Sequence, residues 1–174
     1  MALAVCLLFD PPTERAVRGL WSRLEAQGIR TLESHTHGHH HPHLSYAVLR
    51  EWHLEQVAEK LAGLPDSGPF TLSCQGTLAF PRGRAALAPA ITAEIAGRQE
   101  RVVEAVESAG AELHRNYLPG RWLPHVSIAT RAQGTSLTTV VTTIADTLPL
   151  TLRVDRAALV DSSTGRTWAL PHVP

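Results

Sequence analysis

A six-residue segment at 42–47, with the sequence PHLSYA, returns 82 positions later as PHVSIA at 124–129. Four of the six positions are identical, and the other two are apolar in both copies. In an extended strand alternate side chains share a face, so each copy presents a histidine and a serine side by side on one surface. The opposite surface is expected to face a core (Leu44, Tyr46 and Val48 in the first copy, Val126 and Ile128 in the second). The repeat therefore predicts two equivalent strands around which the rest of the chain is organised.

The first half of the chain surrounds its copy with two helices and two further strands. An apolar run at 2–9 predicts a strand that is buried on both faces. The helix that follows has its apolar stripe at the spacing i, i+3, i+4 and i+7 (Val17, Leu20, Trp21 and Leu24), and Gly28 is placed to end it. After the His/Ser strand, which runs to about Arg50, a second helix has its own stripe (Leu54, Val57, Ala58 and Leu61). Alternation over residues 70–80 then predicts a strand.

The second half repeats this order. Residues 85–90 are expected to pair with 70–80 as a hairpin, and Thr92 is placed to cap a helix that stops near Gly110. Beyond the second His/Ser strand, Ser136 is expected to cap a helix with its own stripe (Leu137, Val140, Val141, Ile144, Ala145 and Leu148), and a hairpin of 150–160 with 167–170 closes the chain. Each half thus reads strand, helix, His/Ser strand, helix, strand, which indicates an ancient duplication and two lobes facing each other across a cleft.

Composition limits the classes of function. The chain has 174 residues, enough for one domain with a hydrophobic interior, and its 16 basic and 16 acidic side chains balance. This balance argues against a protein that coats long nucleic acids, and leaves a small anionic ligand open. Lys60 is the only lysine, so the basic residues are almost all arginine, which suits phosphate recognition or reflects codon bias.

The cysteines and the first strand bear on compartment. Cys6 and Cys74 lie in apolar runs, where a free cysteine behaves as a small buried hydrophobe. With two cysteines and no signal peptide, a reduced, cytoplasmic location is expected. The apolar run at 2–9 is far too short to span a membrane, so no membrane association is expected.

A single His-x-Ser tripeptide carries little information, because a chain with ten histidines should contain one or two by chance. The shared proline, the shared alanine and the matched place in both halves make the pair significant. Two histidines across a cleft are the equipment for in-line phosphodiester cleavage, since one takes a proton from the attacking hydroxyl and the other gives one to the leaving oxygen. The neighbouring serine hydroxyls can donate to the non-bridging phosphate oxygens. Such a mechanism needs no metal.

The two motifs, His43-Leu44-Ser45 and His125-Val126-Ser127, resemble those of the 2H phosphoesterase superfamily, which includes bacterial 2'-5' RNA ligases and cyclic nucleotide phosphodiesterases. The resemblance covers nearly the whole chain and implies a bilobal α+β fold. In that fold two pseudo-symmetric lobes, each with an antiparallel sheet and flanking helices, surround a central cleft. Residues 1–174 would then form a single domain in which the two lobes interleave.

The resemblance also implies a function. The chain is expected to be an enzyme that hydrolyses 2',3'-cyclic phosphates or 2'-5' linkages in RNA ends or small nucleotides, without metal or cofactor and as a monomer. His43 and His125 would be the acid and base, with Ser45 and Ser127 holding the phosphate. Serine stands where the family frequently has threonine, and the hydroxyl is kept. Near-symmetry leaves the two histidine roles open, and the preferred assignment has His125 as base and His43 as acid.

The loop before the second motif contains two candidate substrate-binding residues. Arg121 is placed to meet a phosphate, and Trp122 to stack on a base. The alternative is that Trp122 belongs to the core and Arg121 faces solvent. Tyr117 and Arg82 are weaker candidates of the same kind, whereas the strand alternation points Tyr46 into the core.

Five further histidines lie just before the first motif, at positions 35, 37, 39, 40 and 41. They are expected to form a polar loop at the rim of the cleft that gains positive charge in mild acid and attracts anionic substrate. The alternative is a metal-binding loop in a metal-handling protein, although the spacing is less distinctive than that of structural metal sites. A second alternative for the whole chain is a non-catalytic module that binds RNA ends or nucleotides.

Overall fold

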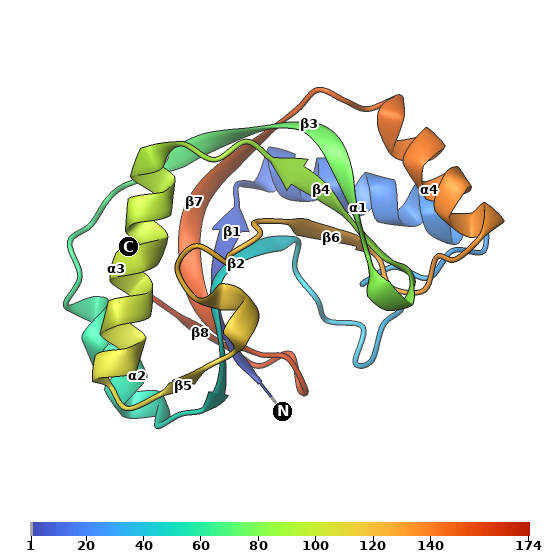
Figure 1. Ribbon diagram of the computed structural model, residues 1–174. Helices are drawn as coiled ribbons and strands as arrows, with labels where there is room; N and C mark the ends of the chain where they lie inside the picture. Colours follow the sequence, from blue (N-terminus) through green and yellow to red (C-terminus); the bar gives the residue numbers. More distant parts are fainter. Residues whose placement is uncertain (1) are drawn as a thin grey trace.

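The computed structural model describes residues 2–174, and within them it shows an α+β fold of four helices and an antiparallel sheet of eight strands (Figure 1). The first half comprises β1 (Leu3–Phe9), α1 (Pro11–Glu25), β2 (His43–Glu51), α2 (Leu54–Ala62) and β3 (Phe70–Phe80). The second comprises β4 (Arg84–Pro89), α3 (Ala93–Ser108), β5 (Glu112–Leu113), β6 (Val126–Ala129), α4 (Thr135–Ala145), β7 (Leu150–Asp161) and β8 (Thr167–Ala169). The predicted order of elements in each half is confirmed, with the short strand β5 added before the second motif.

The strand pairings form a circuit. The sheet runs in the order β1-β2-β6-β4-β3-β7-β8, and β1 also pairs with β7, while β5 pairs with β2. Within residues 2–174 the circuit closes between β2 and β6 through one register pair, Leu44 with Val126. These are the middle residues of the two His-x-Ser motifs, so the fold brings the two copies of the repeat together.

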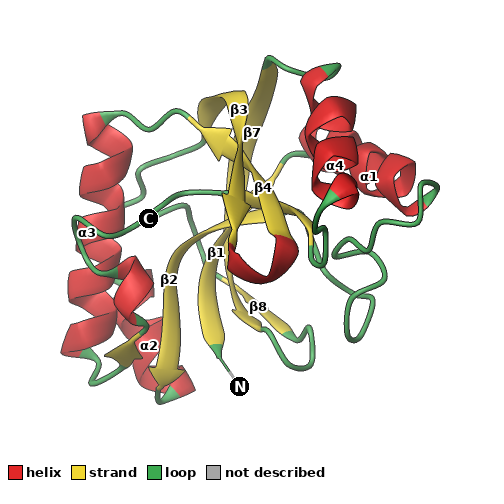
Figure 2. Ribbon diagram, turned by 45° about the vertical axis from the view of Figure 1, so that its right-hand side comes forward, coloured by secondary structure: helices red, strands yellow, loops and turns green. Residues whose placement is uncertain are grey.

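The first helix of each half packs against the motif strand of the other half. Helix α1, which precedes the first motif strand, packs on α4 and on the second motif strand β6. Helix α3, which precedes the second motif strand, packs on α2 and on the first motif strand β2. The two helix pairs therefore lie on opposite sides of the strands (Figure 2).

Helix α1 illustrates how local sequence starts these elements. The side chain of Asp10 accepts a hydrogen bond from the Thr13 backbone N–H at 2.9 Å, and two prolines occupy the first helical positions, where their missing N–H groups cost nothing. Its apolar stripe is buried as predicted (Val17, Leu20, Trp21 and Leu24). None of the helices in the described part of the chain is long and apolar enough to cross a membrane.

The first motif strand departs from the predicted alternation. Ser45 pairs with Cys6 and Ala47 with Val5, so β2 carries one extra residue, a bulge, at this point. The bulge changes which face the later residues occupy. Val48, predicted to face the core, is only half-buried, and Leu49 is buried instead.

Helix α4 also differs from the prediction. Its N-cap is Gly134, with a positive φ of 57°, and the helix begins at Thr135, so Ser136 lies in the first turn and does not cap it. Val141 is 43% exposed, and the buried face consists of Val140, Thr143 and Ile144. The hydroxyl of Thr143 accepts a hydrogen bond at 3.2 Å from the side chain of Gln27, which follows the end of α1.

Candidate active site

The four motif side chains lie on the open face of the sheet where β2 meets β6. Because Leu44 pairs with Val126 in an antiparallel arrangement, the register sets His43 across from Ser127 and Ser45 across from His125. All four side chains are partly exposed, whereas Leu44 and Val126 between them are buried. The arrangement brings two imidazoles and two hydroxyls to one place, as the sequence pattern predicts.

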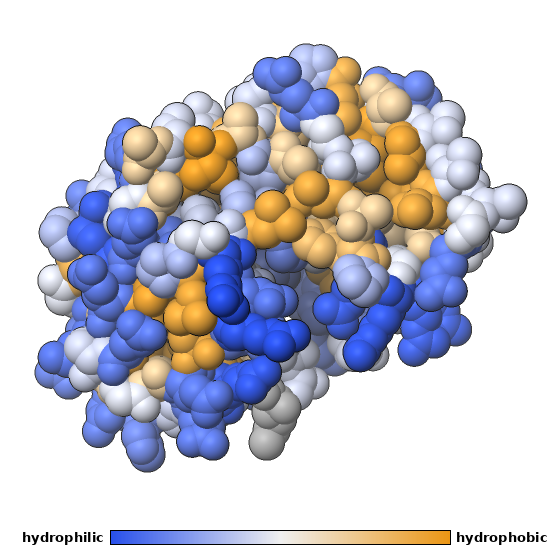
Figure 3. Space-filling view, viewed as in Figure 1, coloured by the Kyte–Doolittle hydropathy of each residue, from blue (hydrophilic) through white to orange (hydrophobic). Residues whose placement is uncertain are grey.

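A hollow marks this face of the molecule. In Figure 3 it lies near the centre of the view, between β2 and the segment that leads from β5 to β6 on one side and the loop before β2 on the other. Hydrophilic residues gather on both sides of the hollow, and a hydrophobic area lies above it over β4 and β6. A polar ligand can therefore enter between hydrophilic walls.

Each motif histidine is oriented by a hydrogen bond between its ring Nδ1 and the backbone carbonyl two residues earlier. The Nδ1 of His43 lies 2.7 Å from the carbonyl oxygen of His41, and the Nδ1 of His125 lies 2.8 Å from that of Leu123. A carbonyl can only accept, so each Nδ1 carries its proton and donates it. In the neutral ring Nε2 is then the free basic nitrogen, which is the form a general base requires.

The surroundings lower the pKa of both rings. Burial lowers the pKa of His43 most, and the charge of His125 lowers it further, while the bond to the His41 carbonyl opposes the shift. Burial also lowers the pKa of His125, followed by the Arg84 charge. Both imidazoles are consequently more acidic than the ordinary value of 6.5, and both favour the neutral form in the free protein.

Two tryptophans hold the backbone of the motif serines. The indole N–H of Trp122 donates to the Ser45 carbonyl at 3.0 Å, and that of Trp21 donates to the Ser127 carbonyl at 3.1 Å. The matched bonds arise from the crosswise packing, since Trp21 lies on α1 and reaches the other half's strand. Bonds of this kind to buried backbone limit the motion of each serine hydroxyl relative to the neighbouring histidine.

A buried glutamine also holds the backbone of the first motif strand. The side-chain amide of Gln99 on α3 donates to the carbonyls of Tyr46 at 3.1 Å and of Tyr117 at 2.8 Å. It thereby ties the first motif strand to the short turn that carries Tyr117. The sequence does not distinguish Gln99 from the other polar residues of its helix, because only the packing of α3 on β2 makes it internal.

Tyr117, which the sequence indicates only as a weaker candidate, lies at the site beside Ser45. Its phenol lies near the Ser45 hydroxyl, the Cys6 thiol and the Arg84 guanidinium. Burial raises the pKa of Tyr117 to about 12, so the phenol keeps its proton and can donate a hydrogen bond. The Ser45 hydroxyl also lies 3.7 Å from the Cys6 thiol, whose pKa burial raises to about 12.

Two residues of the β3–β4 hairpin complete the site, and neither was singled out from the sequence. The Phe80 ring packs against the His125 ring with centroids 4.9 Å apart. Arg84 begins β4, two residues before Ala86, which pairs with Ser127, and its charge acts on both His125 and Tyr117. No local signal identifies Arg84, because its place depends on the pairing of β4 with β6.

The two predicted substrate-binding residues, Arg121 and Trp122, differ from each other in burial. Trp122 is partly buried, its indole N–H is engaged with Ser45, and its ring packs on Tyr46 with centroids 5.7 Å apart. Arg121 is exposed. Stacking of a base on Trp122 and binding of phosphate by Arg121 both stay predictions. Tyr46 is buried, as the alternation predicts.

The histidine-rich loop lies beside the site. Burial lowers the pKa of His40 to about 4, and the charges of His37, His43 and His35 lower it further. His37 packs against Gly165 in the β7–β8 turn and stacks on His39. Within residues 2–174 no group of three or more His, Cys, Asp or Glu side chains is arranged to hold a metal ion.

Comparisons with known proteins give one match to a family model and several solved structures of similar fold. The model of the 2'-5' RNA ligase superfamily matches residues 11–166. Among solved structures, the Usb1 protein of Kluyveromyces marxianus shares 16% identity with a TM-score of 0.54, over 98% of this chain and 96% of that one. E. coli LigT, solved with NADP+, shares 16% identity with a TM-score of 0.56, over 97% and 96%. A phosphoesterase of 15% identity has a TM-score of 0.61, over 97% and 93%. A comparison with curated proteins gives no match.

Proposed function

Because this chain belongs to the 2'-5' RNA ligase superfamily of 2H phosphoesterases, we propose that it is a metal-independent enzyme hydrolysing 2',3'-cyclic or 2'-5' phosphodiester bonds. Its substrates are RNA ends or small nucleotides. Membership in the superfamily supports a phosphoesterase or RNA-processing function. The observation that carries the finer proposal is the pairing of Leu44 with Val126, because it brings both His-x-Ser motifs to one open face.

The chemistry follows from the groups at this face. The scissile phosphate binds between the motifs, where the hydroxyls of Ser45 and Ser127 donate to its non-bridging oxygens. His125 Nε2 takes a proton from the attacking water as the new P–O bond forms, and His43 Nε2 donates a proton to the oxygen that leaves. The bound anion favours the imidazolium form of His43 and so offsets the burial that lowers its pKa.

Two further groups support binding of an anion. The Arg84 guanidinium acts electrostatically on His125, and the Tyr117 phenol, which keeps its proton, can donate beside Ser45. Nucleotides are bound by two of the similar structures, since Usb1 was solved with uridine monophosphate and LigT with NADP+. These ligands make a nucleotide or an RNA terminus the natural class of partner to test.

The test is a substrate panel assayed in excess EDTA. Turnover of 2',3'-cyclic nucleotides or 2'-5' dinucleotides that EDTA leaves unchanged is the expected result. Activity that EDTA abolishes would contradict the metal-independent mechanism. Tight binding of a nucleotide with no product after long incubation would favour the non-catalytic binding module instead.

The pKa shifts predict an acidic optimum for this reaction. The base must be neutral and the acid protonated, so kcat/KM should be bell-shaped, rising as the base loses its proton and falling as the acid loses its own. Both histidine pKa values are lowered from 6.5 in the free protein, and kcat/KM reports the free enzyme, so the maximum is expected below pH 6.5. Rates measured at constant ionic strength across the acidic and neutral range test this. A maximum on the alkaline side of neutrality would contradict it.

A further inference from the structure

A pocket of about 330 Å³ opens beside the first motif. Its polar lining comes from five different parts of the fold (Glu14, His41, Asp155, Arg156, Thr167 and His172). Its floor is apolar and includes Ala158 and Ala169, which pair with each other across β7 and β8. This volume is at the low end of the range for small-molecule sites, and an apolar floor with a few polar groups is their usual lining.

The pocket lies on the same face of the sheet as His43. Leu8 on β1 pairs with His43 on one side and with Arg156 on the other, and cross-strand partners project their side chains to one face. Neighbouring strands are about 4.8 Å apart, so the two residues are separated by about 10 Å across the sheet. A nucleotide spans a distance of this order between its phosphate and the far edge of its base. The pocket is therefore where a base would lie if its phosphate were bound between the motifs.

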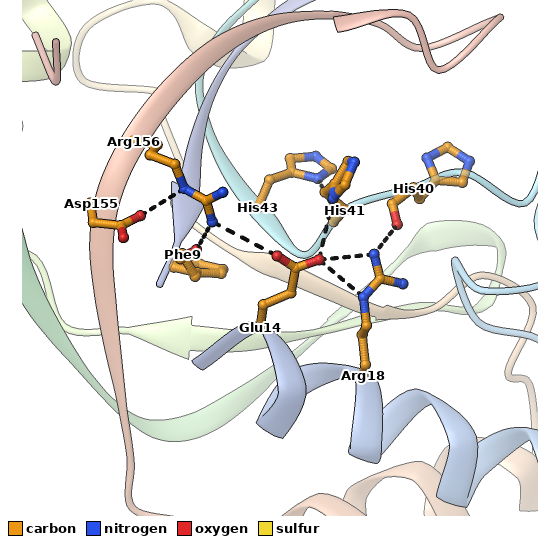
Figure 4. Close-up of polar contacts among 8 residues, drawn as sticks. All are labelled: Phe9, Glu14, Arg18, His40, His41, His43, Asp155 and Arg156. Carbon is orange, nitrogen blue, oxygen red and sulfur yellow. Dashed lines mark hydrogen bonds and ion pairs between the residues drawn. The ribbon is translucent and has the colours of Figure 1, made fainter. Parts of the chain in front are cut away.

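Arg156 presents a flat, immobilised cation to this pocket. Its Nε donates to the Asp155 carboxylate at 2.9 Å, and its terminal nitrogen donates to the Phe9 carbonyl and lies 3.8 Å from the Glu14 carboxylate (Figure 4). Half of the side chain is nevertheless exposed, at 50%. A guanidinium held by its edges leaves its face available, and bases stack on such faces.

Charge balance argues that this pocket receives a base and not a second phosphate. Glu14 also pairs with Arg18 at 2.9 Å and lies 3.2 Å from the His41 ring, so its carboxylate is shared among two arginines and an imidazole (Figure 4). Asp155 and Glu14 together neutralise Arg156 and Arg18. A bound anion would gain little attraction from a neutralised guanidinium and would be repelled by two carboxylates. An uncharged aromatic ring does not depend on that attraction and is not repelled.

The carboxylate of Asp155 offers a free acceptor beside the Arg156 guanidinium. Asp155 uses only Oδ1 toward Arg156, and among residues 2–174 its other oxygen has no hydrogen-bond partner. Carboxylates accept from exocyclic amino groups, as in contacts to the amino group of cytosine. Adenine, cytosine and guanine carry such a group, while uracil offers a carbonyl oxygen at the corresponding position. An acceptor facing an acceptor is unfavourable, so a base whose edge faces the free Asp155 oxygen is favoured by an amino group at that edge and disfavoured by a carbonyl.

We propose that this pocket is a base subsite that prefers nucleotides whose base carries an exocyclic amino group, with the base stacked on Arg156 and its amino group donating a hydrogen bond to the Asp155 carboxylate. The subsite rests on the proposed function, because it assumes that the scissile phosphate lies at the two motifs. Its clearest consequence is a preference for cytidine over uridine nucleotides, which differ at the amino group and are otherwise nearly the same in size.

The experiment compares 2',3'-cyclic CMP with 2',3'-cyclic UMP as substrates, and 3'-CMP with 3'-UMP as ligands in calorimetric titrations. We expect about a tenfold preference for the cytidine compound in kcat/KM and in Kd, the low end of what one base contact contributes. Asp155→Asn is expected to reduce or reverse this preference, because an amide can donate to the uracil carbonyl. Equal binding of 3'-CMP and 3'-UMP to the unaltered protein would overturn the subsite.

Variants of Arg156 test the stacking. Arg156→Ala should raise KM for every base more than it lowers kcat, and Arg156→Lys should behave the same way because it keeps the charge and loses the plane. Arg153→Ala is the matched control, since Arg153 is an exposed arginine three residues earlier on β7. Thermal melts identify any variant that fails to fold, and Asp155→Asn then carries the test. An unchanged KM in folded Arg156→Ala would overturn the stacking.

Different results would contradict the proposed function and the base subsite. If no member of the panel is hydrolysed, the proposed function fails, and the titrations with 3'-CMP and 3'-UMP still decide the subsite. If hydrolysis occurs without discrimination between cytidine and uridine, the function stands and the subsite is wrong.

Discussion

Replacing either His43 or His125 with alanine is expected to lower kcat/KM for a 2',3'-cyclic nucleotide by about 10²–10⁴-fold, the usual contribution of a positioned acid or base. Each imidazole holds Nδ1–H on a backbone carbonyl and leaves Nε2 for proton transfer, so neither can stand in for the other. Steady-state rates in EDTA measure the loss. The double variant should lose much less than the product of the two single losses, because the two histidines act as one unit.

The pH profiles of the two variants assign the roles. Loss of the base removes the acidic limb of the kcat/KM profile, and loss of the acid removes the alkaline limb. His125→Ala should therefore lose the acidic limb and His43→Ala the alkaline limb. The reverse result would exchange the two roles. His53→Ala is the matched control, since His53 is exposed and makes no capping bond to α2. Activity of either motif variant within a few-fold of the unaltered protein would refute the mechanism.

Removing the motif hydroxyls is expected to have the next largest effect. Ser45→Ala and Ser127→Ala should each lower kcat by about 10²–10³-fold, the typical result of deleting one donor to a developing oxyanion. The loss should lie mainly in kcat, because charge on the non-bridging oxygens grows in the transition state. Single-turnover rates with saturating substrate measure the chemical step directly.

Threonine variants separate the hydroxyl from the packing. Ser45→Thr and Ser127→Thr keep the donor and add one methyl group at positions that are only half-buried. Both are expected to retain most of the activity, whereas alanine, which is smaller than serine, should not. If threonine and alanine variants lose activity equally while their melting temperatures match the unaltered protein, the hydroxyls do not act as donors.

Much of the fold could be predicted from local pattern. The alternation at 70–80 coincides with β3, and the stripe on α1 is buried residue for residue, because side-chain periodicity reports directly on which face meets a core. The prediction was wrong where a local irregularity changed the period. The extra residue in β2 moved Val48 off the core face, and Gly134 rather than Ser136 caps α4.

The candidate site likewise contains residues that the sequence indicates and residues that only the structure shows. His43, Ser45, His125 and Ser127 were identified from the repeat, since a strand motif carries its own facing pattern. Arg84 and the Arg156 pocket were not, because the residues that surround them come from strands far apart in the chain. Nothing in the neighbourhood of an arginine in sequence indicates which distant strand it will lie beside.

By itself, the sequence determined the order of elements, the identity of the two His-x-Ser strands and the face on which each presents its polar side chains, because these properties depend on residues a few positions apart. The tertiary structure alone decided that Leu44 pairs with Val126, that Trp21 and Trp122 hold the two serine carbonyls, and that a pocket lies one strand away from His43. The strand pairing and the two tryptophan bonds join residues 77 to 106 positions apart, and contacts over such separations are selected by the packing of the whole chain.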